Sequence, residues 1–356
     1  MPYRIGVIGC GMYGSRLLRV FYDCSNQKQV KLCAVAEIDP VILDEAVRKY
    51  EIAGYSDYIE MIEKEKLDAV AIVTPDHLHE EMAVYCADKG LHMLVQKPLD
   101  VTTDGAKRIA QAAQDNEVLL FVDFHKRYDP SLISLRNKVQ SGQLGEILYG
   151  YLNIEDRIDL PSVHFKSWAH KSTPVWFIGI HMIDVLNWVL GCPPVSVCAV
   201  GGKKKLLSMG IDTFDFIQTK LMYENGACIT LDTSWVLPDC FPSIVNQNVK
   251  LVGTEGIVEI DGQDRGMHVY IGADAGVVEN PYGYLIGDNA LTKASLSGYT
   301  IDSMLHFVKL LGELEQGAGL SGFAGSYTDG FQAVTATRVA EAIHESALDN
   351  GKTVAV

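Results

Sequence analysis

The sequence lacks several features that mark whole classes of protein. It has no uninterrupted apolar run of about 18 residues, which a membrane-spanning helix needs. Its eight cysteines are scattered without a C-x-x-C pair, so they indicate neither a zinc site nor a disulfide framework. Basic residues are in deficit, and the formal net charge of −15 opposes binding to nucleic acid or anionic lipid. We therefore expect neither nucleic-acid nor membrane partners.

The N-terminus and the cysteines favour a reducing, cytoplasmic location. The chain opens with MPYRIGVIGCG, a β-rich segment that begins almost at once and leaves no space for a signal peptide. Cys10, Cys33 and Cys86 fall in apolar periodic segments, as small core residues do. The 356 residues suffice for about two domains, and we find no internal repeat.

The first 123 residues alternate between apolar strands and helices. Strands are expected at Tyr3–Gly9, Val30–Asp39 and Leu67–Pro75, and helices at Met12–Cys24, Pro40–Tyr50 and His77–Gly90. Strands that are apolar throughout are typical of a parallel sheet covered on both faces. We predict an α/β fold here, a Rossmann-type doubly wound parallel sheet over residues 1–123.

The pattern changes after Phe124. Strand candidates such as LYGYLNIEDRI and GACITLDTSWVL are longer and alternate between apolar and polar residues. Asn225-Gly226 between two such runs is a strong hairpin signal. Helical patterns remain at about Phe177–Leu190, Asp302–Glu315 and Asp329–Asp349. We predict that residues 124–356 form an α+β domain with an open, mainly antiparallel sheet.

A glycine pattern joins the first predicted strand to the first helix. Gly9, Gly11 and Gly14 form G-x-G-x-x-G, which is common by chance but specific at a strand-to-helix turn. In a dinucleotide-binding loop Gly9 permits the tight turn, Gly11 admits the pyrophosphate, and Gly14 allows close helix packing. The amides of Met12 and Tyr13 would then point at the phosphates from the helix N-terminus.

Further cofactor contacts are expected at the ends of the next strands. Glu37 ends the second predicted strand, where an acidic residue binds the adenosine ribose hydroxyls. A carboxylate there repels a 2′-phosphate and Ile38 supplies no cation, so NAD is favoured over NADP. The alternative is a solvated strand-end Glu. Thr74 and Pro75 lie at the C-terminal end of the expected strand Leu67–Pro75, where cofactors bind in such sheets.

One nearly apolar segment carries ionisable residues. In TPVWFIGIHMIDVLNWVLG, from Thr173 to Gly191, the polar residues His181, Asp184 and Asn187 share one helical face. A lone histidine in such a helix is more often a satisfied core residue than a catalytic one.

These segments resemble one enzyme family. Together with VTPDHLHEEMAVYCADKGLHMLVQKPL, VDFHKRYDP and EAIHESALDNGKTV, they are similar to the Gfo/Idh/MocA oxidoreductases, the glucose–fructose oxidoreductase and inositol dehydrogenase family. The resemblance covers essentially the whole chain. It implies NAD(P) in the first domain, and substrate contacts and a homodimer or homotetramer surface on the C-terminal sheet. It also implies oxidation of a secondary hydroxyl of a sugar, sugar acid or cyclitol.

The resemblance assigns two catalytic residues. Lys97 matches the lysine beside the nicotinamide that helps hold the reacting hydroxyl, and His181 matches the family's acid or base. Two positions depart from the family pattern, because Gln96 replaces a glutamate and Phe177 replaces the aspartate four residues before the histidine. Asp184 lies on the same helical face and either replaces that partner or is structural. What orients His181 stays open.

Other residues complete the predicted sites. His79, Gln96, Lys97 and Arg127 join the cofactor set, and the substrate set is Lys97, His125, Arg127, His164, Trp168, His170, Lys171, Trp176, His181 and Asp184. The segment Asp156–Trp176, which has no clear family counterpart, gathers cations and aromatic rings suited to sugars and anions. It is alternatively a solvated loop or a subunit contact. We expect no metal site, because His77 and His79 face apart on a helix.

Two further functions remain possible for such a chain. Some relatives use tightly held NAD for a redox-neutral reaction, such as glycoside cleavage or epimerisation. A non-catalytic dinucleotide-binding regulator is the other alternative. Gln96 and Phe177 favour the regulator, whereas Lys97 and His181 favour an enzyme.

Overall fold

The computed structural model describes residues 2–271, 276–286 and 296–356, which form two compact units. Unit 1 comprises Met1–His125 and Thr300–Val334, and unit 2 comprises Lys126–Tyr299 and Thr335–Val356. The predicted boundary after residue 123 lies close to the division at His125. The prediction used a single boundary, whereas residues 300–334 also belong to unit 1. Their place in unit 1 depends on contacts between residues that are distant in sequence.

Unit 1 contains a parallel six-stranded sheet in the order β3-β2-β1-β4-β5-β6. Its strands are β1 (Arg4–Ile8), β2 (Lys31–Ala36), β3 (Ala53–Tyr55), β4 (Ala69–Ile72), β5 (His92–Val95) and β6 (Leu120–Val122). The order reverses direction between β1 and β4, which is the point where ligands bind in open α/β sheets. The predicted Rossmann-type sheet is therefore confirmed.

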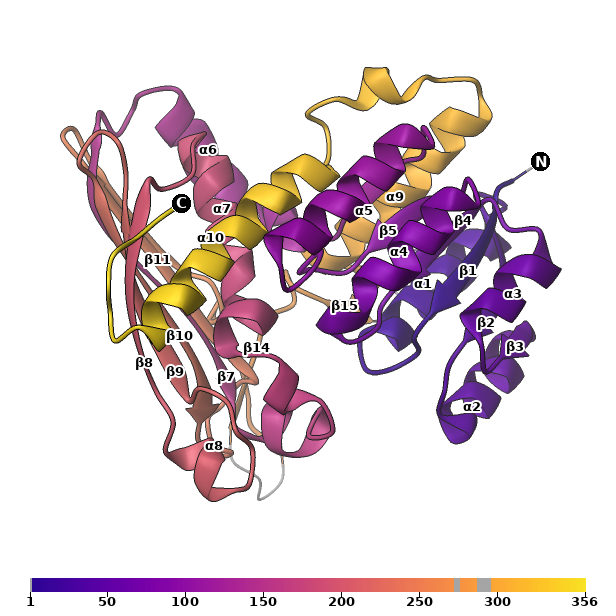
Figure 1. Ribbon diagram of the computed structural model, residues 1–356, viewed down its shortest axis with the longest axis horizontal. Coiled ribbons are helices and arrows are strands. Elements are labelled where there is room, and N and C mark those ends of the chain that lie inside the picture. Colours follow the sequence, from indigo (N-terminus) through magenta and orange to yellow (C-terminus); the bar gives the residue numbers. More distant parts are fainter. Residues whose placement is uncertain (1, 272–275, 287–295) are drawn as a thin grey trace. The chain divides into compact units, whose positions relative to one another are not determined.

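Helices connect and cover these strands (Figure 1). They are α1 (Gly14–Asn26), α2 (Pro40–Tyr50), α3 (Tyr58–Glu65), α4 (His79–Asp88) and α5 (Thr103–Asp115), with short 3-10 turns η1 (Asp76–Leu78) and η2 (His125–Tyr128). Asp39 and Asp57 cap α2 and α3 by accepting backbone N–H bonds in the first turn.

The returning segment of unit 1 packs against the β6 edge of this sheet. It contains α9 (Tyr299–Glu315), η6 (Leu320–Phe323) and the start of α10 (Gly330–Leu348). The amide of Val122 in β6 donates to the carbonyl of Thr328 at 3.0 Å, and Phe121 stacks on Tyr327 with ring centroids 5.7 Å apart. A side chain at Gly330 would lie 2.6 Å from Leu120, so the start of α10 packs tightly against β6.

Unit 2 is built on an open seven-stranded sheet in the order β12-β11-β7-β10-β9-β8-β17. The strands are β7 (Ile147–Arg157), β8 (Ser196–Gly202), β9 (Phe216–Met222), β10 (Cys228–Leu237), β11 (Val245–Gly253), β12 (Ile257–Asp261) and β17 (Val354–Ala355). Among these described strands, only β7 with β10 is parallel, so the sheet is mainly antiparallel as predicted. The predicted Asn225-Gly226 turn joins β9 to β10, with Gly226 at φ +86°.

Helices lie along one side of this sheet (Figure 1). They are α6 (Pro130–Gln140), α7 (Ile180–Leu190) and the C-terminal part of α10. On the other side alternate residues are exposed, as in β9, where Phe216 and Met222 face outward and Leu221 is buried. Smaller elements are η3 (Leu160–His164), η4 (Ala169–Lys171), η5 (Val175–Gly179), α8 (Lys205–Ser208), β13 (Met267–Val269), β14 (Val277–Glu279), β15 (Leu285–Ile286) and β16 (Leu296–Ser297).

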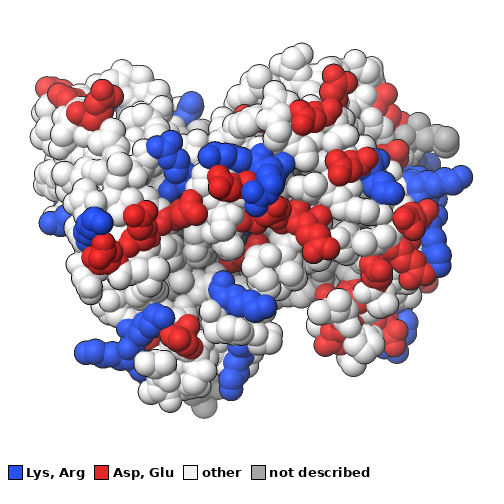
Figure 2. Space-filling view, in the orientation of Figure 1, with Lys and Arg blue, Asp and Glu red and all other residues white. Residues whose placement is uncertain are grey.

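Two surface properties follow the composition. Lys and Arg side chains are interspersed with Asp and Glu on the face drawn in Figure 2, rather than gathered in one basic surface. Within the described ranges, no helix combines the length and apolar character that crossing a bilayer requires.

Candidate functional site

The glycine loop has three positions with different steric demands. Gly9 has φ +91°, and a Cβ built there would lie 2.5 Å from the carbonyl oxygen of Val73. A Cβ at Gly14 would lie 2.3 Å from the carbonyl oxygen of Gly9, so the loop closes tightly on α1. At Gly11 no described atom lies within 4 Å of such a Cβ. Gly11 therefore leaves the backbone open to a ligand, while the other two glycines shape the loop.

The N-terminus of α1 and Glu37 complete this corner of the sheet. No described side chain caps α1, and its first turn holds no acidic residue, so the positive end of the helix is available to an anion. The carboxylate of Glu37 accepts hydrogen bonds from the backbone amides of Cys10, at 2.7 Å, and Asp39, at 3.0 Å. It is thereby fixed beside the glycine loop. Ile38 is 87% exposed, so an apolar side chain follows the carboxylate.

The loops after β4 and β5 are joined by His79. The ring is fully buried; its Nδ1 lies 2.8 Å from the carbonyl oxygen of Pro98, and its Nε2 lies 3.0 Å from that of Thr74. Thr74 and Pro75 are partly exposed just beyond β4. A cofactor contact of His79 stays a prediction, and a buried ring in this position supports the two loops.

Gln96 belongs to a buried polar cluster in unit 1. Its amide donates to Asp123, and the hydroxyl of Tyr13 donates to the same carboxylate oxygen at 3.0 Å. The hydroxyl of Tyr13 also lies 3.2 Å from Nδ1 of His125. His125, a predicted substrate residue, therefore lies beside the glycine loop, and it is only 8% exposed. Sequence reasoning missed Asp123. The available signal was a charged residue directly after the apolar strand VLLFV.

His181 lies in the first turn of α7 and is 4% exposed. The predicted helix start at Phe177 is corrected, because a π-helical turn, η5, occupies Val175–Gly179. A Cβ at Gly179 would lie 2.7 Å from Thr233 in β10, so this turn approaches the sheet closely. Single π turns within helices are frequent at functional sites.

Phe177 belongs to an aromatic cluster in unit 2. Its ring centroid lies 4.6 Å from that of Phe165, 6.0 Å from Trp168 and 5.8 Å from Trp235. Trp235 is fully buried, whereas Phe177 and Trp168 are partly exposed. The position where the family has an aspartate therefore extends an apolar surface one helical turn before His181.

Asp184 forms an ion pair with Arg127. The guanidinium donates to both carboxylate oxygens, at 2.8 Å from Nε and 2.6 Å from Nη2. Asp184 is 1% exposed; burial raises its pKa, and the charge and hydrogen bonds of Arg127 oppose that shift. Both residues were predicted as substrate contacts. Their bidentate pairing supports the structural alternative for Asp184, because the carboxylate is already occupied within unit 2.

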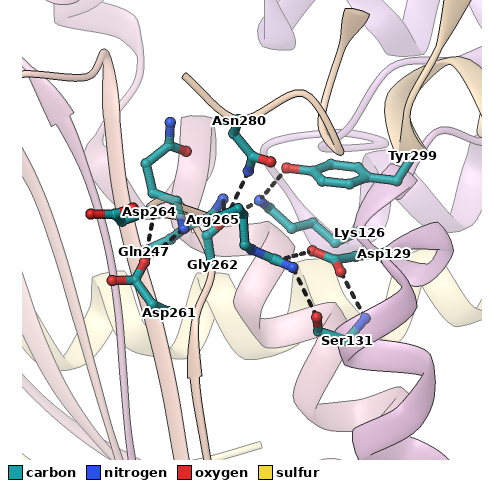
Figure 3. Close-up of polar contacts among 11 residues, drawn as sticks. Lys126, Asp129, Ser131, Gln247, Asp261, Gly262, Asp264, Arg265, Asn280 and Tyr299 are labelled. Atoms are coloured by element: carbon teal, nitrogen blue, oxygen red, sulfur yellow. Dashed lines mark hydrogen bonds and ion pairs between the residues drawn. The ribbon is translucent and has the colours of Figure 1, made fainter. Parts of the chain in front are cut away.

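The segment preceding α6 is anchored by a second network (Figure 3). Lys126 is 5% exposed and donates to Gln247 in β11 and, at 3.3 Å, to the hydroxyl of Tyr299. Asp129 caps α6 at Ser131 and accepts from Arg265 at 2.7 Å. These bonds fix the backbone on both sides of Arg127 within unit 2.

The segment Asp156–Trp176 has exposed and buried parts. His164, His170 and Lys171 are exposed, and His164 lies 3.7 Å from Asp159. Trp176 is 7% exposed and stacks on His344 with centroids 4.8 Å apart. A substrate contact of the exposed residues stays a prediction, whereas Trp176 packs against α10.

Comparisons with known proteins identify the family. Residues 3–124 match the family model "Oxidoreductase family, NAD-binding Rossmann fold", and residues 132–259 match "GFO/IDH/MocA C-terminal domain". The chain belongs to the Gfo/Idh/MocA oxidoreductase family. Its first domain is an NAD-binding Rossmann domain, which confirms the predicted family, enzyme class and cofactor.

Named Gfo/Idh/MocA relatives are moderately similar to this chain. Inositol 2-dehydrogenase 2 of Saccharopolyspora erythraea is 29% identical over 65% of this chain and 66% of its own length. D-glucoside 3-dehydrogenase of Escherichia coli (strain K12) is 27% identical over 69% of this chain and 74% of its own length. The match thus spans about two thirds to three quarters of these proteins.

Solved structures share the fold over the full chain. A myo-inositol 2-dehydrogenase from Lactobacillus plantarum superposes with a TM-score of 0.81 at 22% identity, and both chains are covered completely. A scyllo-inositol dehydrogenase from Lactobacillus casei, solved with NAD(H) and scyllo-inositol, gives a TM-score of 0.78 at 17% identity over 100% of this chain and 99% of that chain. In the part of this Gfo/Idh/MocA chain that is described, no three His, Cys, Asp or Glu side chains gather as a metal ion requires.

Proposed function

We propose that the protein is an NAD-dependent dehydrogenase that oxidises a secondary hydroxyl of a sugar, sugar acid or cyclitol, with Lys97 and His181 at the reacting carbon. The main support is that a Gfo/Idh/MocA chain with an open glycine loop retains both residues. Lys97 lies two residues after β5 in unit 1, and His181 lies in the first turn of α7 in unit 2. The inositol and glucoside dehydrogenases among the relatives support this substrate class.

The two residues divide the work of proton transfer. When bound, NAD would supply the hydride acceptor for the carbinol carbon. An imidazole is suited to accept the hydroxyl proton near neutral pH, so we assign His181 as the base. The ammonium of Lys97 then stabilises the negative charge that develops on the oxygen. Each of these contributions is worth on the order of 10²–10³ in rate.

Residues of unit 1 hold the cofactor in this proposal. Gly11 and the amides of Met12 and Tyr13, at the N-terminus of α1, would hold the pyrophosphate. Glu37 is fixed by the amides of Cys10 and Asp39. Its carboxylate would accept hydrogen bonds from the ribose hydroxyls and repel a 2′-phosphate. Thr74, Pro75, Gln96 and Lys97 border the same edge of the sheet, after β4 and β5.

The outward face of the unit 2 sheet is proposed as the homodimer or homotetramer surface. No described helix covers it, and it carries exposed aromatic and apolar side chains, including Tyr149, Tyr151, Phe216 and Met222. Light scattering of the wild type against Tyr151→Glu/Phe216→Glu tests this surface. An oligomer of unchanged size in that variant would exclude it.

Turnover of NAD with a polyol and sugar-acid panel tests the reaction. We expect NADH formation with at least one cyclitol or sugar by the wild type. Lys97→Ala and His181→Ala should each lose at least about 100-fold in kcat while NAD binding survives. The matched controls Lys107→Ala and His268→Ala alter exposed residues of the same types and should keep normal rates.

The same panel separates the alternatives. Substrate conversion without net NADH would indicate a redox-neutral enzyme with tightly held NAD. NAD binding without conversion of any panel member would favour the regulator. Normal turnover by His181→Ala would assign the base to another residue, with His164 and His170 as the next candidates.

A further inference from the structure

A buried carboxylate lies at the end of β6. Asp123 is 0% exposed and directly follows that strand, which pairs with β5 through Val95 and Val122. The amide of Asp123 donates to the carbonyl of Val95 at 2.9 Å. Gln96 and Asp123 are therefore neighbours at the carboxyl ends of two parallel strands, and Lys97 is the next residue of the chain.

Side chains from three parts of unit 1 donate to this carboxylate. Ser303 of α9 donates to Oδ1, while Gln96 and the hydroxyl of Tyr13 donate to Oδ2. An ionised carboxylate only accepts hydrogen bonds, so three donors match the charged form of Asp123. This arrangement joins the glycine loop, the Gln96-Lys97 turn and the returning helix α9 at one buried charge.

Such a charge requires a counter-charge. Burial raises the pKa of Asp123, whereas the hydrogen bonds from Ser303, Gln96 and Tyr13 and the positive charge of Lys97 oppose that shift. Among the described residues, two further titratable groups lie beside the cluster: Tyr13 and His125, whose ring lies beside that of Tyr13. Isolated buried carboxylates are costly, and an ammonium close enough to act on one reduces that cost.

We propose that Asp123 is the positioning residue for Lys97: it supplies the buried negative charge that favours the ammonium form of this lysine and directs it at the substrate hydroxyl. Gln96 cannot supply that charge, since its amide is neutral, and it instead donates to Asp123. Tyr13 couples the pair to the loop proposed to bind the pyrophosphate. The inference rests on the role proposed above for Lys97.

A merely structural role for Asp123 makes a different prediction. If the carboxylate only ties three segments together, its replacement lowers stability and leaves the titration of Lys97 unchanged. If it balances Lys97, its replacement lowers the proton affinity of that lysine, because a neighbouring opposite charge favours the charged form.

The test measures the apparent pKa of Lys97 in the full-length protein. Lysines are dimethylated with ¹³C and followed by NMR against pH, with the Lys97 signal assigned by its loss in Lys97→Arg. In Asp123→Asn we expect the apparent pKa of Lys97 to fall by about one unit, a tenfold change in proton affinity. Ser303→Ala removes a hydrogen bond but no charge and should shift it less than threefold.

A charge transposition provides the sharper control. In Gln96→Glu/Asp123→Asn the carboxylate moves one strand along the same cluster. We expect the Lys97 titration to return to within about threefold of the wild type, and kcat and its pH profile to recover with it. An equal Lys97 titration in the wild type and in folded Asp123→Asn would overturn the proposal, as would an unrestored titration in the double variant.

Two features keep this test decisive. If Asp123→Asn does not fold, Lys97→Met provides the reciprocal measurement, because removing the lysine charge should raise the apparent pKa of Asp123 in carboxyl ¹³C NMR. No change there would equally refute the pairing. Both titrations are made without substrate. Failure of the polyol panel therefore removes the proposed reaction but leaves the Asp123–Lys97 test intact.

Discussion

Alanine at two positions of the glycine loop should have opposite effects on stability. Gly11 and Gly14 are three residues apart in one motif, yet no described atom lies within 4 Å of a Cβ at Gly11, while a Cβ at Gly14 meets the carbonyl of Gly9 at 2.3 Å. Gly11→Ala should therefore stabilise the free protein and weaken NAD binding. Gly14→Ala should weaken both.

The stability changes follow from sterics and chain entropy. Replacing Gly by Ala where the backbone accepts it stabilises a protein by roughly 0.4–1 kcal/mol through the unfolded state. A backbone clash such as that at Gly14 costs about 1–3 kcal/mol, which outweighs that gain. With roughly 2–4 °C per kcal/mol for a domain of this size, the Tm should rise by about 1–4 °C in Gly11→Ala and fall by several degrees in Gly14→Ala.

The change in NAD affinity follows from lost hydrogen bonds. A methyl group at Gly11 would hold the pyrophosphate away from the loop amides. Hydrogen bonds to a charged group contribute about 1.5–3 kcal/mol, so the loss of one weakens binding about 10- to 150-fold.

Differential scanning calorimetry and NAD titration measure both quantities on the same samples. The opposite signs of the two Tm changes make the comparison independent of any general effect of mutation. Wild-type NAD affinity in Gly11→Ala would refute the assignment of this loop to the pyrophosphate. A lower Tm in Gly11→Ala would refute the steric reasoning.

Three further predictions address the cofactor, the segment before α7 and acid stability. NAD should bind more tightly than NADP in calorimetric titration, and Glu37→Ser/Ile38→Arg should reverse that order by removing a carboxylate and adding a cation. Lys171→Glu should raise KM for sugar acids but not for neutral polyols, because an exposed cation then becomes an anion. Burial lowers the pKa of His344 to about 4, below the value near 6.5 in the unfolded chain, so its contribution to stability is complete above about pH 6.5 and is lost as the pH falls toward 4. Urea unfolding should show a loss of up to about 3 kcal/mol over this window that His344→Gln largely removes.

Each of these has a contradicting result. Equal or tighter NADP binding by the wild type would mean that Glu37 does not bind the ribose. An unchanged KM for every sugar acid would favour the solvated-loop interpretation of Lys171. If the free energy of unfolding falls with decreasing pH equally in His344→Gln and in the wild type, the titrating groups lie elsewhere.

Local patterns sufficed for the sheet of unit 1 and for its glycine loop. Both depend on short-range features, namely apolar runs separated by helices and three glycines at a strand-to-helix turn. The return of residues 300–334 to unit 1 was not predictable in this way, because it depends on contacts of Val122 with Thr328 and of Phe121 with Tyr327. The helix carrying His181 was predicted, but its π-helical start depends on how closely Gly179 approaches β10.

The polar residues show the same limit more sharply. Sequence spacing placed Asp184 on the His181 face of α7, but it could not show that Arg127, from a distant segment, occupies both carboxylate oxygens. Likewise, when the sequence is considered alone, Gln96 in place of the family's glutamate removes a negative charge beside Lys97. Only the pairing of β5 with β6 brings Asp123 to the amide of Gln96. A departure from a family motif therefore has to be judged against the residues that the fold brings next to it, and here the neighbouring strand carries the carboxylate that position 96 lacks.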